Sequence, residues 1–163
     1  MRNLEPALYT DPAVFARECA AIFRSSWQLI GPASCLSEPG DYVATEIAGA
    51  KIVAVRGKDG VLRAFRNVCR HRGARLFEEG EGRCNVIRCQ YHNWVYDLDG
   101  SLRQAPWFGE DADFNMDEWP LEPISIEPWR GLAFVAIDPS VTLEKQLGAT
   151  VPELADEPIE EFR

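Results

Sequence analysis

Both histidines of this chain lie in short stretches that also hold a cysteine. In "NVCRHRGARL" His71 follows Cys69 by two residues, in "RCQYHNW" His92 follows Cys89 by three, and the 163 residues contain no other histidine. Residues two apart in an extended segment point the same way, so a C-x-H loop can aim both groups at one spot, and a C-x-x-H turn can do so from a second loop. The seventeen residues between the pairs suffice for strands that bring the loops together. The pattern predicts one metal centre with two thiolate and two imidazole ligands.

The order of these ligands bears on which metal they hold. Zinc sites usually pair like with like, as C-x2–4-C followed by H-x3–5-H. Here each loop supplies one cysteine and one histidine, which suits a [2Fe–2S] cluster with both cysteines on one iron and both histidines on the other. Two ferric ions, two sulfides and two thiolates sum to zero charge. Such a cluster accepts an electron more readily than one held by four thiolates.

Most of the remaining chain has the pattern of short strands bounded by Gly, Pro and Asp. Residues 51–67 predict a hairpin that turns at Asp59-Gly60, and residues 84–104 predict a second strand pair that turns at Asp99-Gly100. Further strands are expected within 27–31, 41–47, 124–128 and 130–138. Because tight turns join neighbouring strands, the sheets should be antiparallel. The fold class is therefore mostly β.

One helix is expected near the start of the chain, over residues 10–27. Thr10 or Asp11 can cap it, and Pro12 suits its first turn. Its apolar residues recur at helical spacing and are expected to face a core. They are Phe15, Cys19, Ile22 and Phe23.

Charge and cysteine usage limit the partners and the compartment. The formal net charge is −9, which argues against binding nucleic acid through its phosphates and against binding an anionic membrane surface. The sequence contains no apolar run of membrane-spanning length, and its first residues do not read as a secretion signal. An odd number of cysteines, five, fits a disulfide framework poorly. We expect reduced thiols and a cytoplasmic protein.

The loops "CRHRGA" and "CQYHNW" resemble the two cluster loops of Rieske proteins, and more narrowly those of the N-terminal Rieske domain of ring-hydroxylating oxygenase large (alpha) subunits. The stretches "DPAVFARECAAIFRSSWQLIG" and "EPWRGLAFVAIDP" extend the resemblance over about residues 8–140. It implies a Rieske-type fold of antiparallel sheets with two cluster-binding loops plus an N-terminal α-helix. Residues 1–137 are then the Rieske domain, and residues 138–163, with a net charge of −5, an acidic connector toward a catalytic domain absent from this chain.

The resemblance also implies a role in electron transfer. A reductase or ferredoxin would give electrons to the cluster, which would pass them to a mononuclear Fe(II) site in the catalytic domain of the same or a neighbouring subunit. The full-length protein would be a homotrimer and a mono- or dioxygenase. That iron is held by two histidines and a carboxylate. This chain cannot supply them, because its only histidines are His71 and His92.

Two positions near the motifs need comment. The family usually has glycine after the second histidine, where this chain has Asn93. Glycine there suits a backbone with positive φ, and asparagine is the next most tolerant residue, so the loop should keep its shape. Cys84 lies five residues before Cys89 on an expected strand, and we expect it to be a buried thiol and no ligand. Respiratory Rieske proteins carry an additional cysteine in each loop, which neither loop has here.

Two other functions fit parts of the pattern. A free-standing Rieske ferredoxin would share the loops, although the N-terminal helix and the long segment after Gln104 argue against it. A zinc-stabilised binding module would use the same four ligands and would be colourless.

Residues 63–88 contain seven arginines against three glutamates, a net charge of +4. This segment can stabilise a reduced cluster or steer an acidic electron donor, or it can be a row of solvated strand edges.

Overall fold

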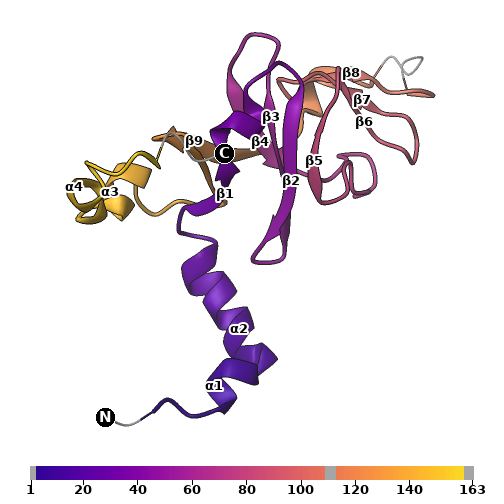
Figure 1. The fold of residues 1–163 in the computed structure, drawn as a ribbon. Helices are drawn as coiled ribbons and strands as arrows, with labels where there is room; N and C mark the ends of the chain where they lie inside the picture. Colours follow the sequence, from indigo (N-terminus) through magenta and orange to yellow (C-terminus); the bar gives the residue numbers. More distant parts are fainter. Residues whose placement is uncertain (1–2, 109–112, 160–163) are drawn as a thin grey trace.

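The computed structural model describes residues 3–108 and 113–159, and its strands form two antiparallel sheets (Figure 1). The larger sheet has the order β1-β10-β9-β4-β3-β2-β5, and the smaller has the order β6-β7-β8. The prediction of a mostly β, antiparallel fold with an N-terminal helix is confirmed. The strands are β1 (Gln28–Pro32), β2 (Asp41–Ile47), β3 (Ala50–Arg56), β4 (Leu62–Arg66), β5 (Gly80–Arg83), β6 (Ile87–Arg88), β7 (Val95–Tyr96), β8 (Leu102–Gln104), β9 (Pro123–Trp129) and β10 (Leu132–Ala136).

The predicted hairpins turn where the sequence indicates. Strands β3 and β4 are joined through Asp59-Gly60, and β7 and β8 through Asp99-Gly100. In the second turn the Asp97 N–H donates to the Ser101 carbonyl at 2.9 Å, and Gly100 has φ +91°. A Cβ on Gly100 would lie 2.5 Å from the Phe65 ring, so only glycine lets this turn pack on the larger sheet.

The helices are short. They are α1 (Ala7–Thr10), α2 (Pro12–Glu18), a π-helical turn (Cys19–Phe23), α3 (Leu143–Leu147) and α4 (Thr150–Glu153), with 3-10 turns at Ala33–Leu36 and Met116–Glu118. Asp11 caps α2 by accepting from the Ala13 N–H at 2.8 Å, as predicted. No helix in the described part of the chain is both long and apolar enough to cross a membrane.

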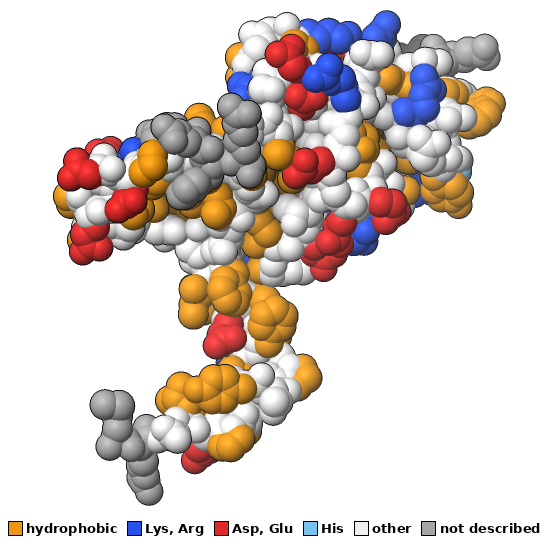
Figure 2. Space-filling view, in the orientation of Figure 1, with side chains coloured by type: hydrophobic (Ala, Val, Ile, Leu, Met, Phe, Trp, Pro, Cys, Tyr) orange, Lys and Arg blue, Asp and Glu red, His pale blue; other side chains and the backbone are white. Residues whose placement is uncertain are grey.

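The prediction that the N-terminal helix turns its apolar stripe to a core is wrong in this chain. Phe15 is 58% exposed and Ile22 is 53% exposed, while Cys19 and Phe23 are only partly buried. Figure 1 shows α1 and α2 projecting away from the sheets, and Figure 2 shows hydrophobic side chains along them. Helical spacing of apolar residues indicates a face that avoids water, but it does not say which element covers that face.

The residues after β10 pack back onto the start of β1. Gln146 in α3 accepts from the Trp27 N–H at 2.7 Å and donates to the Trp27 carbonyl at 2.9 Å, and the Trp27 indole donates to the Val141 carbonyl at 2.8 Å. Leu143 is buried beside Trp27 and Phe134. The described part of the expected connector, residues 138–159, is therefore folded against the domain. Residues 160–163 of that connector lie outside the described residues.

Removal of the Gln146 side chain tests this packing. Gln146→Ala leaves two backbone groups of Trp27 without their partner, and we expect the free energy of unfolding to fall by about 1–2 kcal/mol. Lys145→Ala, in the same helix but without a hydrogen bond through its side chain among the described residues, is the matched control. Equal stability of the two variants in denaturant titrations would contradict the role given to Gln146.

Candidate metal centre

The four predicted ligands lie on two loops that repeat the same turn. In the first loop the Cys69 N–H donates to the carbonyl of Ala74 at 2.7 Å, and the Gly73 N–H donates to the Cys69 carbonyl at 3.0 Å. In the second loop the Cys89 N–H donates to the carbonyl of Trp94 at 2.8 Å, and the Asn93 N–H donates to the Cys89 carbonyl at 3.0 Å. Both cysteines are therefore fixed by the residues four and five positions ahead.

The fourth residue after each cysteine has a left-handed backbone. Gly73 has φ +72° and Asn93 has φ +57°. The positive φ predicted for Asn93 is thus confirmed, and Asn93 occupies in its loop the position that glycine occupies in the other. Asparagine tolerates this conformation better than most side chains. The departure from the family pattern therefore leaves the turn intact.

A buried asparagine braces the first loop at its base. Asn67, only 2% exposed, donates to the Phe77 carbonyl at 2.7 Å and accepts from the Phe77 N–H at 2.9 Å. A bridge between Val68 and Arg75 closes the loop one step further. The second loop needs no such brace, because β6 and β7 hold its ends as a hairpin.

The two thiols lie in the protein interior. Cys69 and Cys89 are each 2% exposed and belong to one hydrophobic cluster with Trp94 and Tyr96. Burial raises the pKa of the Cys69 thiol, and the neighbouring Cys89 adds to this, whereas hydrogen bonds from Tyr96 and the His71 backbone lower it. The two sulfurs thus lie close together in a site where charge is costly unless a cation neutralises it.

The two imidazoles lie together at the edge of the same site. The ring centroids of His71 and His92 are 4.6 Å apart, and both side chains are partly exposed. Burial, with the nearby His92 and Arg72, lowers the pKa of His71, which keeps its ring neutral and able to bind a metal. Nδ1 of His71 is buried and has no hydrogen-bond partner among the described residues. An unpartnered ring nitrogen beside two buried thiols fits a metal ligand.

Aromatic rings enclose these imidazoles on several sides. Trp94 stacks on His71 with centroids 4.9 Å apart and planes 9° apart, and Phe108 meets His71 edge-on at 5.2 Å. Tyr91 lies over His92 with centroids 3.7 Å apart. Trp94 is buried, but Tyr91 is 63% exposed. Trp94 therefore excludes water from the inner side of the imidazole pair, and Tyr91 forms an exposed aromatic surface on its outer side.

The arrangement in two pairs separates the two metal alternatives. The two sulfurs form one buried pair, and the two imidazoles form a second, partly exposed pair. A zinc site needs four ligands around one ion at about 2.0–2.3 Å. A [2Fe–2S] cluster of mixed ligation instead needs two thiolates on one iron and two imidazoles on the next. The residues present fit the two-iron cluster.

Tyr96, which the sequence analysis did not single out, connects the two loops. Its hydroxyl oxygen accepts from the Arg70 N–H at 3.1 Å and lies 3.4 Å from Sγ of Cys69. Burial and the contact with Cys69 raise the pKa of Tyr96, so it keeps its proton. With Arg70 donating to its oxygen, that proton is free to point at the sulfur. Tyr96 packs in the same hydrophobic cluster as Trp94, two residues before it, and this i, i+2 spacing could have found it.

Other predicted residues lie away from the four ligands. Cys84 packs half-buried against the core, and burial raises its pKa to about 11, as expected of an inert thiol.

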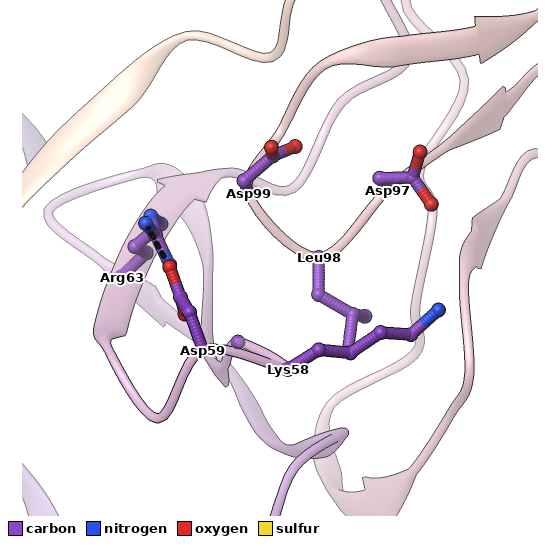
Figure 3. A pocket seen from close by; sticks show the side chains of 7 residues that line it. Lys58, Asp59, Arg63, Asp97, Leu98 and Asp99 are labelled. Atoms are coloured by element: carbon purple, nitrogen blue, oxygen red, sulfur yellow. Dashed lines mark hydrogen bonds and ion pairs between the residues drawn. The ribbon is translucent and has the colours of Figure 1, made fainter.

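A hollow of about 210 Å³ lies between the β3–β4 and β7–β8 turns, where Lys58, Asp59 and Asp97 line it (Figure 3). Figure 3 shows Asp59 engaged by Arg63, and Asp97 pairs with Arg103 at 3.3 Å, so these carboxylates are already neutralised.

Comparison with known proteins agrees with this geometry. A family model described as the Rieske [2Fe–2S] domain matches residues 26–120. The carnitine monooxygenase oxygenase subunit of Escherichia coli (strain K12) is 44% identical over 154 residues, which are 91% of this chain and 41% of that protein. Benzene 1,2-dioxygenase subunit alpha of Pseudomonas putida is 35% identical over 148 residues, covering 90% of this chain and 33% of that protein. The chain thus spans about two fifths or less of these relatives.

A solved structure shares the fold. It is that of a quaternary ammonium Rieske monooxygenase, which gives insights into carnitine oxidation and inter-subunit electron transfer in that enzyme; the TM-score is 0.83 at 39% identity, over 91% of this chain and 41% of the other. The fold and the matches define an iron–sulfur protein. The chain belongs to the Rieske [2Fe–2S] domain family, and its relatives are oxygenase alpha subunits. Its cofactor is accordingly a [2Fe–2S] cluster of the Rieske type.

The contact between Tyr96 and Cys69 generates a prediction. Tyr96→Phe removes a donor that stabilises extra negative charge on the sulfur, so the reduction potential should fall, by roughly 50 mV for a differential free energy of about 1 kcal/mol. Redox titration of the visible spectrum measures it. Tyr91→Phe, which changes a hydroxyl on the exposed ring, is the control and should leave the potential within error. A Tyr96→Phe potential equal to wild type would refute the hydrogen bond.

Proposed function

We propose that Cys69 and Cys89 bind one iron of the [2Fe–2S] cluster and that His71 and His92 bind the other. The observation that carries this is the separation into a buried thiol pair and a partly exposed imidazole pair on two equivalent turns. When bound, the cluster accepts one electron and returns it. The protein side chains set the charge of the cluster. The two thiolates balance the positive charge of the iron and sulfide core in the interior, and the two neutral ligands, the imidazoles, lie at the surface side.

We further propose that the chain relays electrons as the Rieske domain of a ring-hydroxylating oxygenase alpha subunit. A reductase or ferredoxin would supply the electrons, and a mononuclear iron in the catalytic domain of the same or a neighbouring subunit of a homotrimer would receive them. The sequence similarity to oxygenase subunits more than twice as long as this chain supports this. Inter-subunit electron transfer in the quaternary ammonium monooxygenase supports the exchange between neighbours.

The domain boundary and the compartment belong to the same proposal. Residues 1–137 would form the Rieske domain, and residues 138–163 would lead to the catalytic domain. Strand β10 is the last strand and ends at Ala136, which supports a boundary for the sheets there, and α3 beyond it packs back onto Trp27. All five cysteines are free thiols. Free thiols that are buried or partly buried support a reducing compartment, the cytoplasm.

Substitution of the proposed thiolate ligands is the first test. Cys69→Ser or Cys89→Ser should strongly lower the iron and sulfide content of anaerobically prepared protein. Loss of a residue that only supports a metal ligand costs roughly 10–100-fold in metal affinity, and loss of a ligand itself should cost more. Cys84→Ser, which alters a nearby cysteine outside the four ligands, should keep the red-brown colour and two irons per chain. A colourless wild-type protein that contains zinc would contradict the proposal.

Replacement of a proposed imidazole ligand tests the second iron. His71→Cys or His92→Cys adds a thiolate charge, so the reduction potential of the cluster should fall by roughly 100 mV or more, toward the values of clusters with four cysteines. Redox titration followed by visible or EPR spectroscopy measures the change. A stable, cluster-containing variant of unchanged potential would show that the ligands are wrongly assigned.

A further inference from the structure

The fold holds the two cluster loops in different ways. The second loop joins β6 to β7, and these strands pair with each other, so a hairpin fixes both of its ends. The first loop joins β4 to β5, but β3 and β2 lie between these two strands in the larger sheet. Its base has the Asn67 side chain and the bridge between Val68 and Arg75. The part of the first loop that carries the ligands must be held by other contacts.

Arg70 supplies two such contacts, one from its backbone and one from its side chain. It stands between the ligands Cys69 and His71. Its N–H donates to the hydroxyl oxygen of Tyr96 at 3.1 Å, and its guanidinium donates to the carboxylate of Glu122 at 2.5 Å. Because Arg70 is bonded directly to both ligand residues in the chain, a movement of Arg70 displaces both of them.

Glu122 is itself held by the larger sheet. Its carbonyl accepts from the Arg66 N–H at 2.8 Å, and its carboxylate pairs with Nε of Arg66 at 3.1 Å. Leu121 before it is buried, and Pro123 after it begins β9, which pairs with β4. The carboxylate is therefore kept in one place by its own strand, so its contact with Arg70 costs little additional side-chain entropy.

The ion pairs of residues 63–88 set Glu122 apart from the other carboxylates. Of the four carboxylates that pair with arginines of this segment at 2.5–3.4 Å, Glu122 alone pairs with two of them among the described residues. An isolated exposed ion pair contributes little to stability, but a carboxylate shared by two arginines forms a network that contributes more. The pairs are Arg63 with Asp59, Arg66 and Arg70 with Glu122, Arg75 with Glu46, and Arg83 with Asp41.

A groove lies between the first loop and this ion-pair network. It has a volume of about 440 Å³, and its lining includes Arg66, Arg70 and Glu122 together with Cys69 and Gly73 of the turn. Because this space is open, tight packing does not hold the loop on that side. The ion pairs of Glu122 are what join the loop to the sheet there.

We propose that Glu122 is a positioning residue for the first cluster loop. It holds Arg70 by the side chain while Tyr96 holds it by the backbone, and through Arg70 it fixes Cys69 and His71. This rests on the ligands of the proposed function and goes beyond them by naming a residue far along the chain on which two of them depend. The negative charge of Glu122 also opposes the addition of an electron to the cluster.

Release of the cluster tests the positioning. When the cluster-loaded chain is mixed with an excess of iron chelator, Glu122→Ala should lose its visible absorbance about three- to tenfold faster than wild type. The backbone bond to Arg66 does not use the removed side chain, so the pairing of β4 with β9 remains. Asp138→Ala is the matched control. It removes an exposed ion pair with Arg24 at the opposite, β1–β10 edge of the larger sheet, and should release the cluster within about twofold of the wild-type rate.

A double variant tests whether Glu122 acts through Arg70. Arg70→Met removes the same contact from the other side, so Glu122→Ala/Arg70→Met should release the cluster within about twofold of the faster single variant. A double variant whose acceleration is the product of the two single effects would show that the residues act separately, and would overturn the proposal.

The reduction potential gives a readout that a purely structural role would not change. Glu122→Gln keeps an oxygen that accepts from Arg70 but loses the negative charge. At the wild-type midpoint potential, its ratio of reduced to oxidised cluster should therefore rise about twofold or more, whereas Asp138→Asn should leave the ratio unchanged. An unchanged ratio in Glu122→Gln, or a Glu122→Ala variant that keeps its cluster as long as wild type, would overturn the role of Glu122 and leave the proposed function standing. A wild-type chain that holds no iron and sulfide would instead overturn the proposed function itself.

Discussion

The metal centre depends on a turn that the chain makes twice. In each loop the cysteine backbone is bonded on both its N–H and its carbonyl side, and a left-handed residue lets the chain double back to make those bonds. Because the turns are alike, the two sulfurs arrive in the interior from opposite loops with equal burial. The ring pair at the edge, the aromatic wall and the tyrosine that joins the loops are all placed relative to these two fixed points.

Charge and burial change together across the centre. On the inner side, two thiols sit among aromatic and aliphatic side chains, where two thiolates need the positive charge of iron to exist. On the outer side, partly exposed imidazoles meet the solvent. This asymmetry suits a group that stores one electron: the buried side limits reorganisation of water, and the exposed side gives access to another protein.

The sequence predicted the parts of this molecule that local chemistry decides. Asp-Gly dipeptides located the two tight turns, Asp11 the helix cap, and the position after His92 a left-handed backbone. Interactions between segments distant in the sequence could not be predicted from it. The bond from Tyr96 to Cys69, and the brace from Asn67 to Phe77, depend on how the sheets pack. A charge run did not reveal which arginines are neutralised, because their partners Asp41, Glu46 and Glu122 lie far along the chain.

The prediction for the N-terminal helix was wrong, whereas the packing of the segment after β10 was not predicted. The helix has apolar residues at the right spacing, yet they face water in this chain, since periodicity does not specify a partner. The acidic segment carries little apolar patterning, yet Leu143 and Gln146 fasten it to Trp27. The burial of Leu143 and the two hydrogen bonds of the Gln146 amide are enough to hold this acidic segment on the domain.

The Tyr96 hydroxyl belongs to the strand after the second loop but contacts the backbone and the sulfur of the first. The two halves of the centre are thereby joined through one side chain. A substitution at Tyr96 therefore acts on both loops at once, although the residue follows only the second of them in the chain.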